Sequence, residues 1–309
     1  MSLTIPKSNY AIRDQKGTTA FYVLLKKNPR ISLKLFDDYW RNVHGPVCAR
    51  LPGQYQYWQF HVKHSQKDLW SIHPDIEYDL PPEDQFDGIA ELTFTREEER
   101  QIWFKAAAIL MNDEQNLFSK AIGYNTSPNN SLTYLDRLAT GDPNGKIDCL
   151  KLHVLVKKAD SASLSSFREY MSKHFAQRII QNDSVLKFRL HLFEEVDNSR
   201  PDAGLVMHSE PLEKQYQAAF EIAVANTLKK QQFFASTDYL AASENISQYV
   251  KQINPFPERT AYTFVYGGKM TLAGQRGSTV AELITEVGAV NQLQSDVVDL
   301  MSGQTSNLF

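Results

Sequence analysis

Apolar and polar positions in the first 140 residues follow the two periods that distinguish strands from helices. Residues 55–62 alternate strictly, which predicts a half-buried strand, and apolar residues recur at helical spacing from Phe36 to Val47. The predicted elements are strand 21–25, a helix beginning after Ser32, strand 55–62, strand 89–94, helix 95–111 and strand 131–135. This βαββαβ order is that of a ferredoxin-like α+β unit.

The first predicted helix carries a proline near its end. Pro46 cannot donate a backbone hydrogen bond and disfavours helical geometry at Gly45, so we expect the helix to end or kink at His44. An imidazole titrates near neutrality, and the carbonyl end of a helix favours its protonated form. His44 is therefore a candidate for proton exchange.

The element pattern occurs twice in the chain. Residues 21–27 (FYVLLKK) match residues 152–158 (LHVLVKK) at an offset of 131, and Ala90-Glu91-Leu92 match Phe220-Glu221-Ile222 at 130. Similar order and spacing indicate a duplication. We place the one-residue deletion in the second helix, which aligns His61 with His191.

The breaker-rich segment 141–146 (GDPNGK) marks the predicted boundary between the copies. Residues 1–140 then form the first domain, and residues 141–309 form the second domain with an added C-terminal helix. Thr279 and Glu282 form a capping box for that helix. We interpret its apolar stripe as core packing rather than as a partner site.

A motif in the first helix resembles that of a known family. Tyr39-Trp40-Arg41-x-x-His44-Gly45-Pro46, followed by Ala49-Arg50-Leu51-Pro52, is similar to the signature of EthD-like proteins of the dimeric α+β barrel superfamily. The resemblance covers about residues 20–62. It implies that two ferredoxin-like sheets pack face to face, here as a barrel within one chain. The second copy lacks the Trp-Arg and Gly-Pro pairs, so we expect the first half to carry the chemistry.

Strand alternation then assigns faces within this barrel. Glu91 and Glu221 should point inward, because their neighbours along each strand form an apolar face. We expect Tyr57, Gln59 and His61 to point inward too, with His61 meeting Glu91 and His191 meeting Glu221. Such pairs serve a site, or only satisfy buried polar groups, and the sequence leaves both readings open.

These patterns define the candidate site. The predicted catalytic residues are His44, His61 and Glu91. The predicted substrate-binding residues are Tyr22, Tyr39, Trp40, Tyr57, Trp58, Arg50, His191 and Glu221. Structural alternatives stay beside these roles: His44 as a helix-terminating residue, Tyr39 and Trp40 as packing, and Arg50 as a surface ion-pair partner.

Composition narrows the function classes. The net charge of −3 gives no basic field for nucleic acid, and no apolar run approaches the roughly 20 residues that span a bilayer. Two cysteines make no disulfide framework, and the polar N-terminus has no secretory apolar core. We expect a soluble, cytoplasmic protein.

Cofactor motifs are also missing from the sequence. It has no Gly-rich nucleotide-binding motif, P-loop, His-Glu-x-x-His or Cys-x-x-Cys. We predict no cofactor and no metal ligand set. A haem stays open because some proteins of the fold bind it, and a divalent metal on two His and two Glu stays open as a minor alternative.

The resemblance implies an enzyme that acts on a small apolar, aromatic or polyketide-like molecule by His-centred acid–base chemistry. Oxidation without a cofactor, decarboxylation and isomerisation all fit, and a non-enzymatic protein that binds such a ligand is the alternative. A homo-oligomer through the C-terminal helix or the long loops 65–85 and 195–215 is left open. If these loops serve as lids or interfaces, Trp70 and Ile72 should be buried.

Overall fold

The computed structural model describes residues 8–199 and 204–301, and the chain folds as an α+β protein with two similar halves. The strands of the first half are β1 (Thr19–Lys27), β2 (Gln56–Val62), β3 (Gly88–Phe94), β4 (Phe118–Asn125) and β5 (Ser131–Asp136). Its helices are α1 (Leu33–Tyr39), a π-helical turn η2 (Trp40–His44), α2 (Gly45–Ala49), α3 (Glu97–Ala106) and α4 (Ala108–Leu117).

The second half repeats this order after the short strand β6 (Asn144–Gly145). Its strands are β7 (Leu150–Lys158), β8 (Val185–Leu192), β9 (Ala218–Val224) and the long β10 (Val250–Tyr266). Its helices are α5 (Leu164–Glu169), the π turn η5 (Tyr170–Phe175), α6 (Ala176–Ile179), α7 (Thr227–Phe234) and α8 (Thr237–Ala242). The chain continues through β11 (Lys269–Met270), α9 (Leu272–Arg276), α10 (Ser278–Val287), η8 (Val290–Leu293) and α11 (Ser295–Met301).

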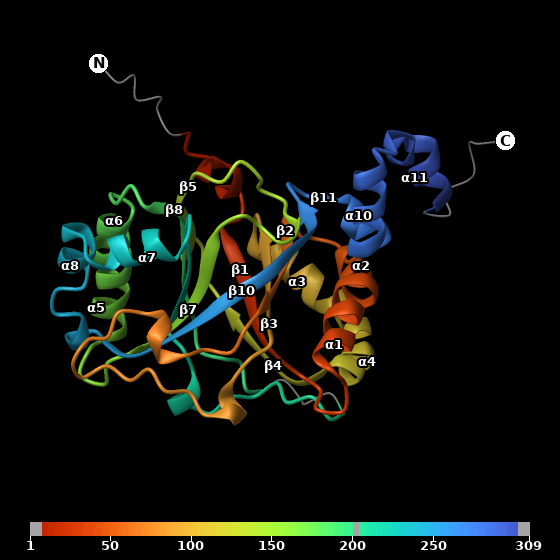
Figure 1. The fold of residues 1–309 in the computed structure, drawn as a ribbon. Helices are drawn as coiled ribbons and strands as arrows, with labels where there is room; N and C mark the ends of the chain where they lie inside the picture. The colour runs from red at the N-terminus through yellow and green to blue at the C-terminus, as the bar shows by residue number, and fades with distance from the viewer. Residues whose placement is uncertain (1–7, 200–203, 302–309) are drawn as a thin grey trace, which may run out of the picture.

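All strands belong to one 11-stranded sheet with the order β4-β1-β3-β2-β10-β7-β9-β8-β5, and β6 and β11 pair with β10. The strand β10 joins the halves, because Val250–Pro257 pairs with β7 and Glu258–Val265 pairs with β2 (Figure 1). In return, β5 of the first half pairs with β8 of the second. Strand pairing among residues 8–199 and 204–301 does not close the sheet, but Glu194 N donates to Asn125 O across the gap at 2.9 Å.

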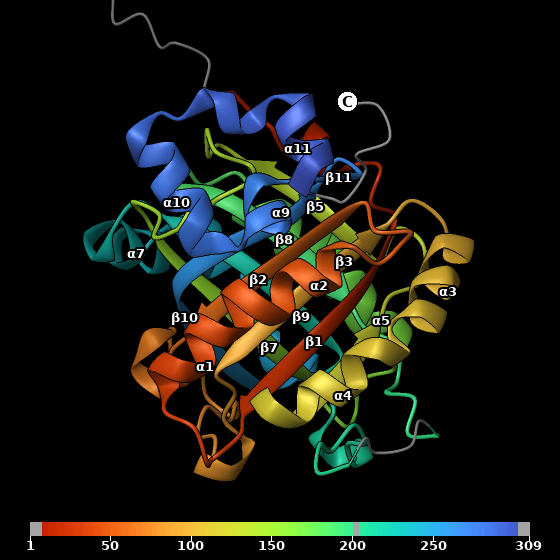
Figure 2. The ribbon, with the colours of Figure 1, turned by 90° about the vertical axis from the view of Figure 1, so that its right-hand side faces the viewer.

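The helices of each half cover the outer face of its own strands. Figures 1 and 2 show α1–α4 over β1–β4, with α5–α8 on the opposite side of the molecule. Between the strands lies an apolar cluster from both halves, which includes Tyr22, Trp58, Phe60, Phe193 and Phe256. The inner faces of the two halves therefore share one core.

The fourth strand of each copy differs from the sequence-based expectation. In the first half that strand is β4, directly after α4, where no breaker residue separates helix from strand. The predicted strand at 131–135 exists as β5, but it pairs with β8 of the other half. The last strand of the second copy, β10, likewise pairs with β2 of the first copy over Glu258–Val265.

The face assignment of β2 is wrong. Tyr57, Gln59 and His61 point toward the helices, and Trp58 and Phe60 point into the shared core. The cause is the position of the deletion. Trp58 pairs with Glu91, and Arg189 pairs with Glu221 at the same place in the second half. Trp58 is therefore equivalent to Arg189, and the offset between the copies is still 131 in this strand (189 − 58).

The one-residue difference between the copies lies in the loop after β2, which is one residue longer than the equivalent loop after β8. Ser65 N donates to Gln85 Oε1, and Val196 N donates to Gln215 Oε1 in the equivalent loop of the second half. The offset between the copies is 131 at the donors (196 − 65) and 130 at the acceptors (215 − 85), so it changes within this loop. A slip of one residue exchanges the faces of a strand. The predicted equivalence of His61 with His191 is therefore wrong, whereas that of Glu91 with Glu221 is confirmed.

The first helix does not end at His44. It passes through the π turn η2 and continues as α2 to Ala49, with Gly45 N donating to Trp40 O. The second half has the same π turn without a proline, because Ala176 and Gln177 follow η5. Pro46 is therefore accommodated by the turn and is not needed to form it.

The apolar stripe of the C-terminal segment is exposed, so its interpretation as core packing is wrong. Leu283 is 56 %, Val287 80 % and Val290 74 % exposed, and α10 and α11 project from the body (Figure 1). Oligomerisation through this segment or the long loops stays a prediction. Within the described ranges, no helix has the length and apolar character that crossing a membrane requires.

The two long loops pack across the halves. Trp70, from the loop after β2, is buried against Phe220, Phe234 and Tyr239 of the second half. Ile72 is 61 % exposed, so only one of the two residues expected to be buried is buried. The equivalent loop of the second half returns to the first, where Met207 N donates to Ser119 O at 3.1 Å.

Candidate functional site

A cavity of about 500 Å³ lies between the strands of the first half and their helices. This region is seen face-on in Figure 2, under α2, α3 and α4. Its walls are mostly apolar and include Phe21, Val23, Leu92, Trp103, Met111 and Phe118. Gly123 lies in the wall where a Cβ would come within 2.4 Å of the Phe21 ring. Ligand sites commonly have this form, an apolar hollow with few polar groups.

The second half completes this cavity. Val196, Asp197 and His208 line it, and all three belong to the segment that follows β8. Val206 of the same segment is fully buried in the core under the first-half helices. The cavity is therefore built by both copies of the duplicated unit.

The histidine of the EthD-like motif stands in the cavity wall. Its Nδ1 donates to Asp113 Oδ2 at 2.8 Å, and Tyr39 Oη donates to Asp113 Oδ1 at 2.7 Å. Burial raises the pKa of Asp113, but the hydrogen bonds from His44 and Tyr39 outweigh it and lower that pKa. The ionised Asp113 thus fixes the proton of His44 on Nδ1. No hydrogen bond to Nε2 is found among the described residues.

A second histidine–carboxylate contact lies in the same wall. His208 Nε2 and Glu114 Oε2 are 2.8 Å apart, and both residues line the cavity. Asp113 and Glu114 are neighbours on α4, so one helix holds both histidines. Cys48 also lines the cavity, and burial raises the pKa of its thiol, which keeps it protonated.

Two of the predicted site residues border the cavity directly. His44 and Trp40 line it, and Tyr39 reaches it through Asp113. Arg50 does not: it donates to Pro46 O, Gly274 O and Gln275 O, which fastens α2 to α9. The expected apolar walls of Tyr22, Tyr39 or Trp58 are replaced by other residues.

His61 and Tyr57 lie under the helices of the first half but outside the cavity lining. His61 Nδ1 donates to Asp37 Oδ1 at 2.6 Å, so the expected pairing with Glu91 is wrong. The pair is enclosed: the ring of Trp40 covers His61 at 4.5 Å, and His61 Nε2 has no partner among the described residues. Burial lowers the pKa of His61.

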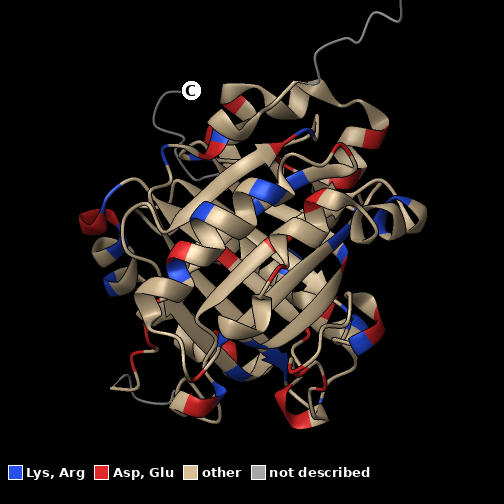
Figure 3. Cartoon of the chain, turned by 90° about the vertical axis from the view of Figure 1, so that its left-hand side faces the viewer, with Lys and Arg blue, Asp and Glu red and all other residues tan. Residues whose placement is uncertain are grey.

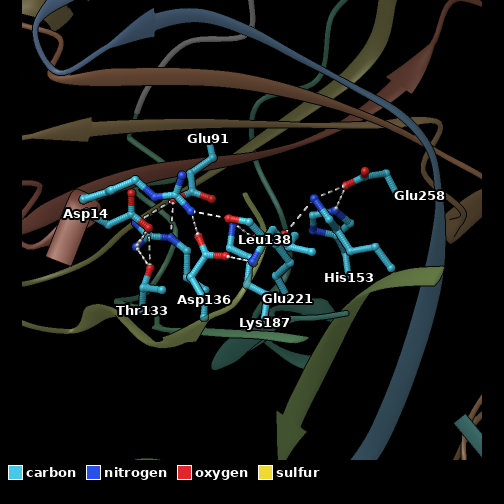
Figure 4. Close-up of polar contacts among 12 residues, drawn as sticks. Asp14, Glu91, Thr133, Asp136, Leu138, His153, Lys187, Glu221 and Glu258 are labelled. Carbon is cyan, nitrogen blue, oxygen red and sulfur yellow. Dashed lines mark hydrogen bonds and ion pairs between the residues drawn. The ribbon is translucent and has the colours of Figure 1, made fainter. Parts of the chain in front are cut away.

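The remaining predicted residues lie between the two sets of strands, where Figure 4 labels Glu91 and Glu221. Glu91 accepts from Arg189 at 2.7 Å and faces His191 at 3.5 Å, so the expected pairing of His191 with Glu221 is wrong. Glu221 instead pairs with Lys151 and Lys187. Tyr22 and Trp58 pack beside this network, the Tyr22 ring 4.9 Å from His191. Every charge in it has an opposite partner, as buried charges require.

The network also bears on the metal alternative. His61 lies on the other face of β2, away from Glu91, Glu221 and His191, so the imagined set of two His and two Glu does not form. In the described ranges, no three His, Cys, Asp or Glu side chains gather as metal ligands would.

Sequence reasoning missed Asp113, Glu114 and His208. The predicted helix 95–111 stopped short of both acids, whereas α4 runs to Leu117. His208 lies in a loop of the other half, 164 residues after His44, and only the fold brings the two near one cavity. A helix predicted to run up to the next strand would have included Asp113 and Glu114, but no local signal in the sequence marks His208.

The fold and site define an α+β protein with a histidine-bearing cavity in its first half. Residues 28–121 match the EthD domain. The motif histidine, Asp113 and Glu114 all lie within the matched residues. No curated protein sequence matches the chain at a significant level.

Several solved structures are similar in outline. A candidate monooxygenase from Lactobacillus acidophilus has 11 % identity and a TM-score of 0.46, over 81 % of this chain and 98 % of that one. A candidate monooxygenase from Fusobacterium nucleatum has 5 % identity and a TM-score of 0.48, over 82 % of this chain and 98 % of that one. An anthrone oxidase-like protein has 8 % identity and a TM-score of 0.45, over 79 % of this chain and 92 % of that one. Similarities this distant carry no argument about the reaction.

Proposed function

We propose that the protein is an enzyme that binds a small apolar or aromatic molecule in the first-half cavity and transfers protons at His44. The observation that carries this proposal is the hydrogen bond of His44 Nδ1 to Asp113 in the wall of an apolar cavity of about 500 Å³. A histidine held by a carboxylate has a fixed tautomer, and the second nitrogen is then available to a substrate.

The apolar walls favour a ring system over a sugar or a nucleotide. Figure 3 colours Lys and Arg blue and Asp and Glu red along the ribbon, and both colours are scattered over the side of the molecule that faces the viewer. The few polar groups of the cavity would fix the orientation of a carbonyl or hydroxyl group. Oxidation, decarboxylation and isomerisation of such a molecule each include a proton transfer, and each stays within the proposal.

The test is turnover with a panel of hydroxyquinones and aromatic keto acids. General acid–base catalysis is worth roughly 10²–10⁴-fold, so His44→Ala should lower kcat by that factor while the ligand still binds. The control is His174→Ala, in the shallow pocket of the second half, which should leave kcat unchanged.

The alternative function is ligand binding without chemistry. The mostly apolar walls of the cavity would serve a carrier equally well. Saturable binding of the panel with no turnover, unchanged in His44→Ala, would establish the carrier and overturn the enzyme.

We also propose that the two halves form tandem ferredoxin-like units whose sheets face each other as an intrachain barrel. The strand orders β4-β1-β3-β2 and β10-β7-β9-β8 support it, as does the core shared between them. Residues 1–140 and 141–309 remain the proposed domains. Cytoplasmic localisation also remains a proposal.

A further inference from the structure

The wall that carries His44 also carries a second proton-transfer candidate. Glu114 lines the cavity, its Oε2 contacts His208, and its Oε1 makes no hydrogen bond within the described ranges. The side chain is 19 % exposed, so it is neither sealed in the core nor free in solvent. A carboxylate held by one oxygen presents the other to a bound molecule.

Glu114 and His44 converge on one region of the cavity. His44 and Cys48 are four residues apart, which places them on one face of the continuous π/α segment. Glu114 and Cys48 both line the cavity. Asp113, the next residue on α4, holds His44 itself. A molecule in this cavity therefore meets an imidazole and a carboxylate.

We propose that Glu114 is a second catalytic residue, held in place by His208 of the second half, and that the reaction is the isomerisation of an enolisable ketone fused to an apolar ring. This inference rests on the proposed function and names its substrate class. His208 is a positioning residue, because it acts through Glu114.

The proton transfers balance without an oxidant. Glu114 Oε1 accepts a proton from the carbon next to the carbonyl, and the C–H electron pair forms the C=C bond of the enolate. The C=O electron pair moves to oxygen, which takes the proton from Nε2 of a protonated His44. The product is the enol, Glu114 is left protonated and His44 neutral, and exchange with solvent restores both. Two groups of different acidity suit such a transfer.

The test measures deuterium exchange at the α-carbons of 2-tetralone and 2-indanone in D₂O by NMR, with binding followed separately by ligand-observed titration. Wild type should accelerate exchange, and Glu114→Gln should lower the rate at least 100-fold with binding kept within about threefold. The matched control is Glu244→Gln in the second-half pocket, which should leave the rate unchanged.

His208 needs a readout that simple destabilisation would not move. His208→Ala removes the contact to Glu114, whereas His208→Gln keeps a donor of similar reach. With equal melting temperatures, the Gln variant should retain a larger share of the exchange rate than the Ala variant.

The outcomes separate the two levels of the proposal. Exchange that is lost in His44→Asn but kept in Glu114→Gln overturns the role of Glu114 and leaves the proposed function standing. Binding without exchange in wild type overturns the isomerisation and the role of Glu114, and the proposed function is then decided by turnover of the hydroxyquinone and keto acid panel. Equal rates for the two His208 variants overturn its positioning role.

Discussion

Two histidine–carboxylate contacts in the first half are similar in length, but one is enclosed by other side chains and the other borders the cavity. His61 lies 2.6 Å from Asp37 and His44 lies 2.8 Å from Asp113. His61 is sealed beneath Trp40, while His44 borders the cavity. Burial raises the pKa of Asp37, but hydrogen bonds from Arg259 and His61 outweigh it and lower that pKa to about 2. The first pair fastens α1 to the sheet, and the second is open to a ligand.

This contrast supplies a matched experiment. Asp113→Asn should lower kcat by roughly 10²-fold or more, because the amide no longer fixes the tautomer of His44. Asp37→Asn removes the same chemical group from the sealed pair and should lower the melting temperature with kcat unchanged. Steady-state kinetics and thermal melts measure both, and equal kcat losses in the two variants would contradict the role of Asp113.

Glu91 and Arg189 form the central ion pair between the halves, with both side chains at most 2 % exposed. Arg189→Met should destabilise the protein by about 3–5 kcal/mol, because it leaves a buried carboxylate unpaired. Urea unfolding measures this loss. The control is Lys173→Met, whose pair with Glu169 is exposed and should contribute about 0–1 kcal/mol.

The same pair has a defined pH dependence. Burial raises the pKa of Glu91, but the charges of Arg189 and His191 outweigh it and lower the pKa to about 2. A depressed folded-state pKa contributes stability that is complete above the unfolded value of about 4.3 and is lost as the pH falls through the folded value. The destabilisation by Arg189→Met should therefore be smaller at pH 3 than at pH 7. Urea unfolding of both proteins at the two pH values measures this, and an equal or larger loss of stability at pH 3 would contradict it.

At the scale of elements, the strand β2 shows what periodicity can and cannot decide. Alternation correctly predicted the strand, and it correctly placed Glu91 and Glu221 on inner faces. Both faces of β2 are buried, so polarity marks no solvent side there, and the misplaced deletion then aligned the wrong faces of β2 and β8. Gln59 Nε2 finds Trp40 O and His61 finds Asp37, contacts that only the packed helix supplies.

The cavity was predictable in part. The motif pointed to His44, and His44 lines the cavity. Its other polar groups were not predictable, because Asp113 and Glu114 lie past the predicted end of a helix and His208 comes from a loop of the other copy. Such long-range convergence leaves no periodic trace in the sequence.

The π turn places Gly45 against the sheet. A Cβ on Gly45 would come within 2.5 Å of the Phe264 ring and 2.9 Å of Gln59 Nε2. Gly45→Ala should therefore destabilise the protein by about 1–3 kcal/mol, since overpacking a tight core has that cost. Thermal melts test this, and Phe264→Leu in the same chain should recover part of the loss. An unchanged melting temperature in Gly45→Ala would contradict the close packing.

At the scale of the whole molecule, the halves exchange strands and loops. The first half gives β5 and Trp70 to the second, and it receives part of β10 and His208 in return. Residues 1–140 expressed alone should therefore not fold cooperatively, because β2 would be an unpaired edge and the cavity would lack one wall. Circular dichroism melts and amide NMR dispersion check this, and a sharp cooperative melt of the fragment would refute it.

The exchange of β10 also sets an order of events during synthesis. The pairing of Val62 with Glu258 joins residues 196 positions apart, since 258 − 62 = 196. At the 5–20 residues per second of translation, roughly 10–40 s pass between the synthesis of β2 and that of its partner. During this interval β2 presents an open strand edge on the ribosome, where a neighbouring nascent chain could pair with it. The nascent first half thus has a period of exposure that the finished protein conceals, and its yield in cells should depend on chaperones that bind early.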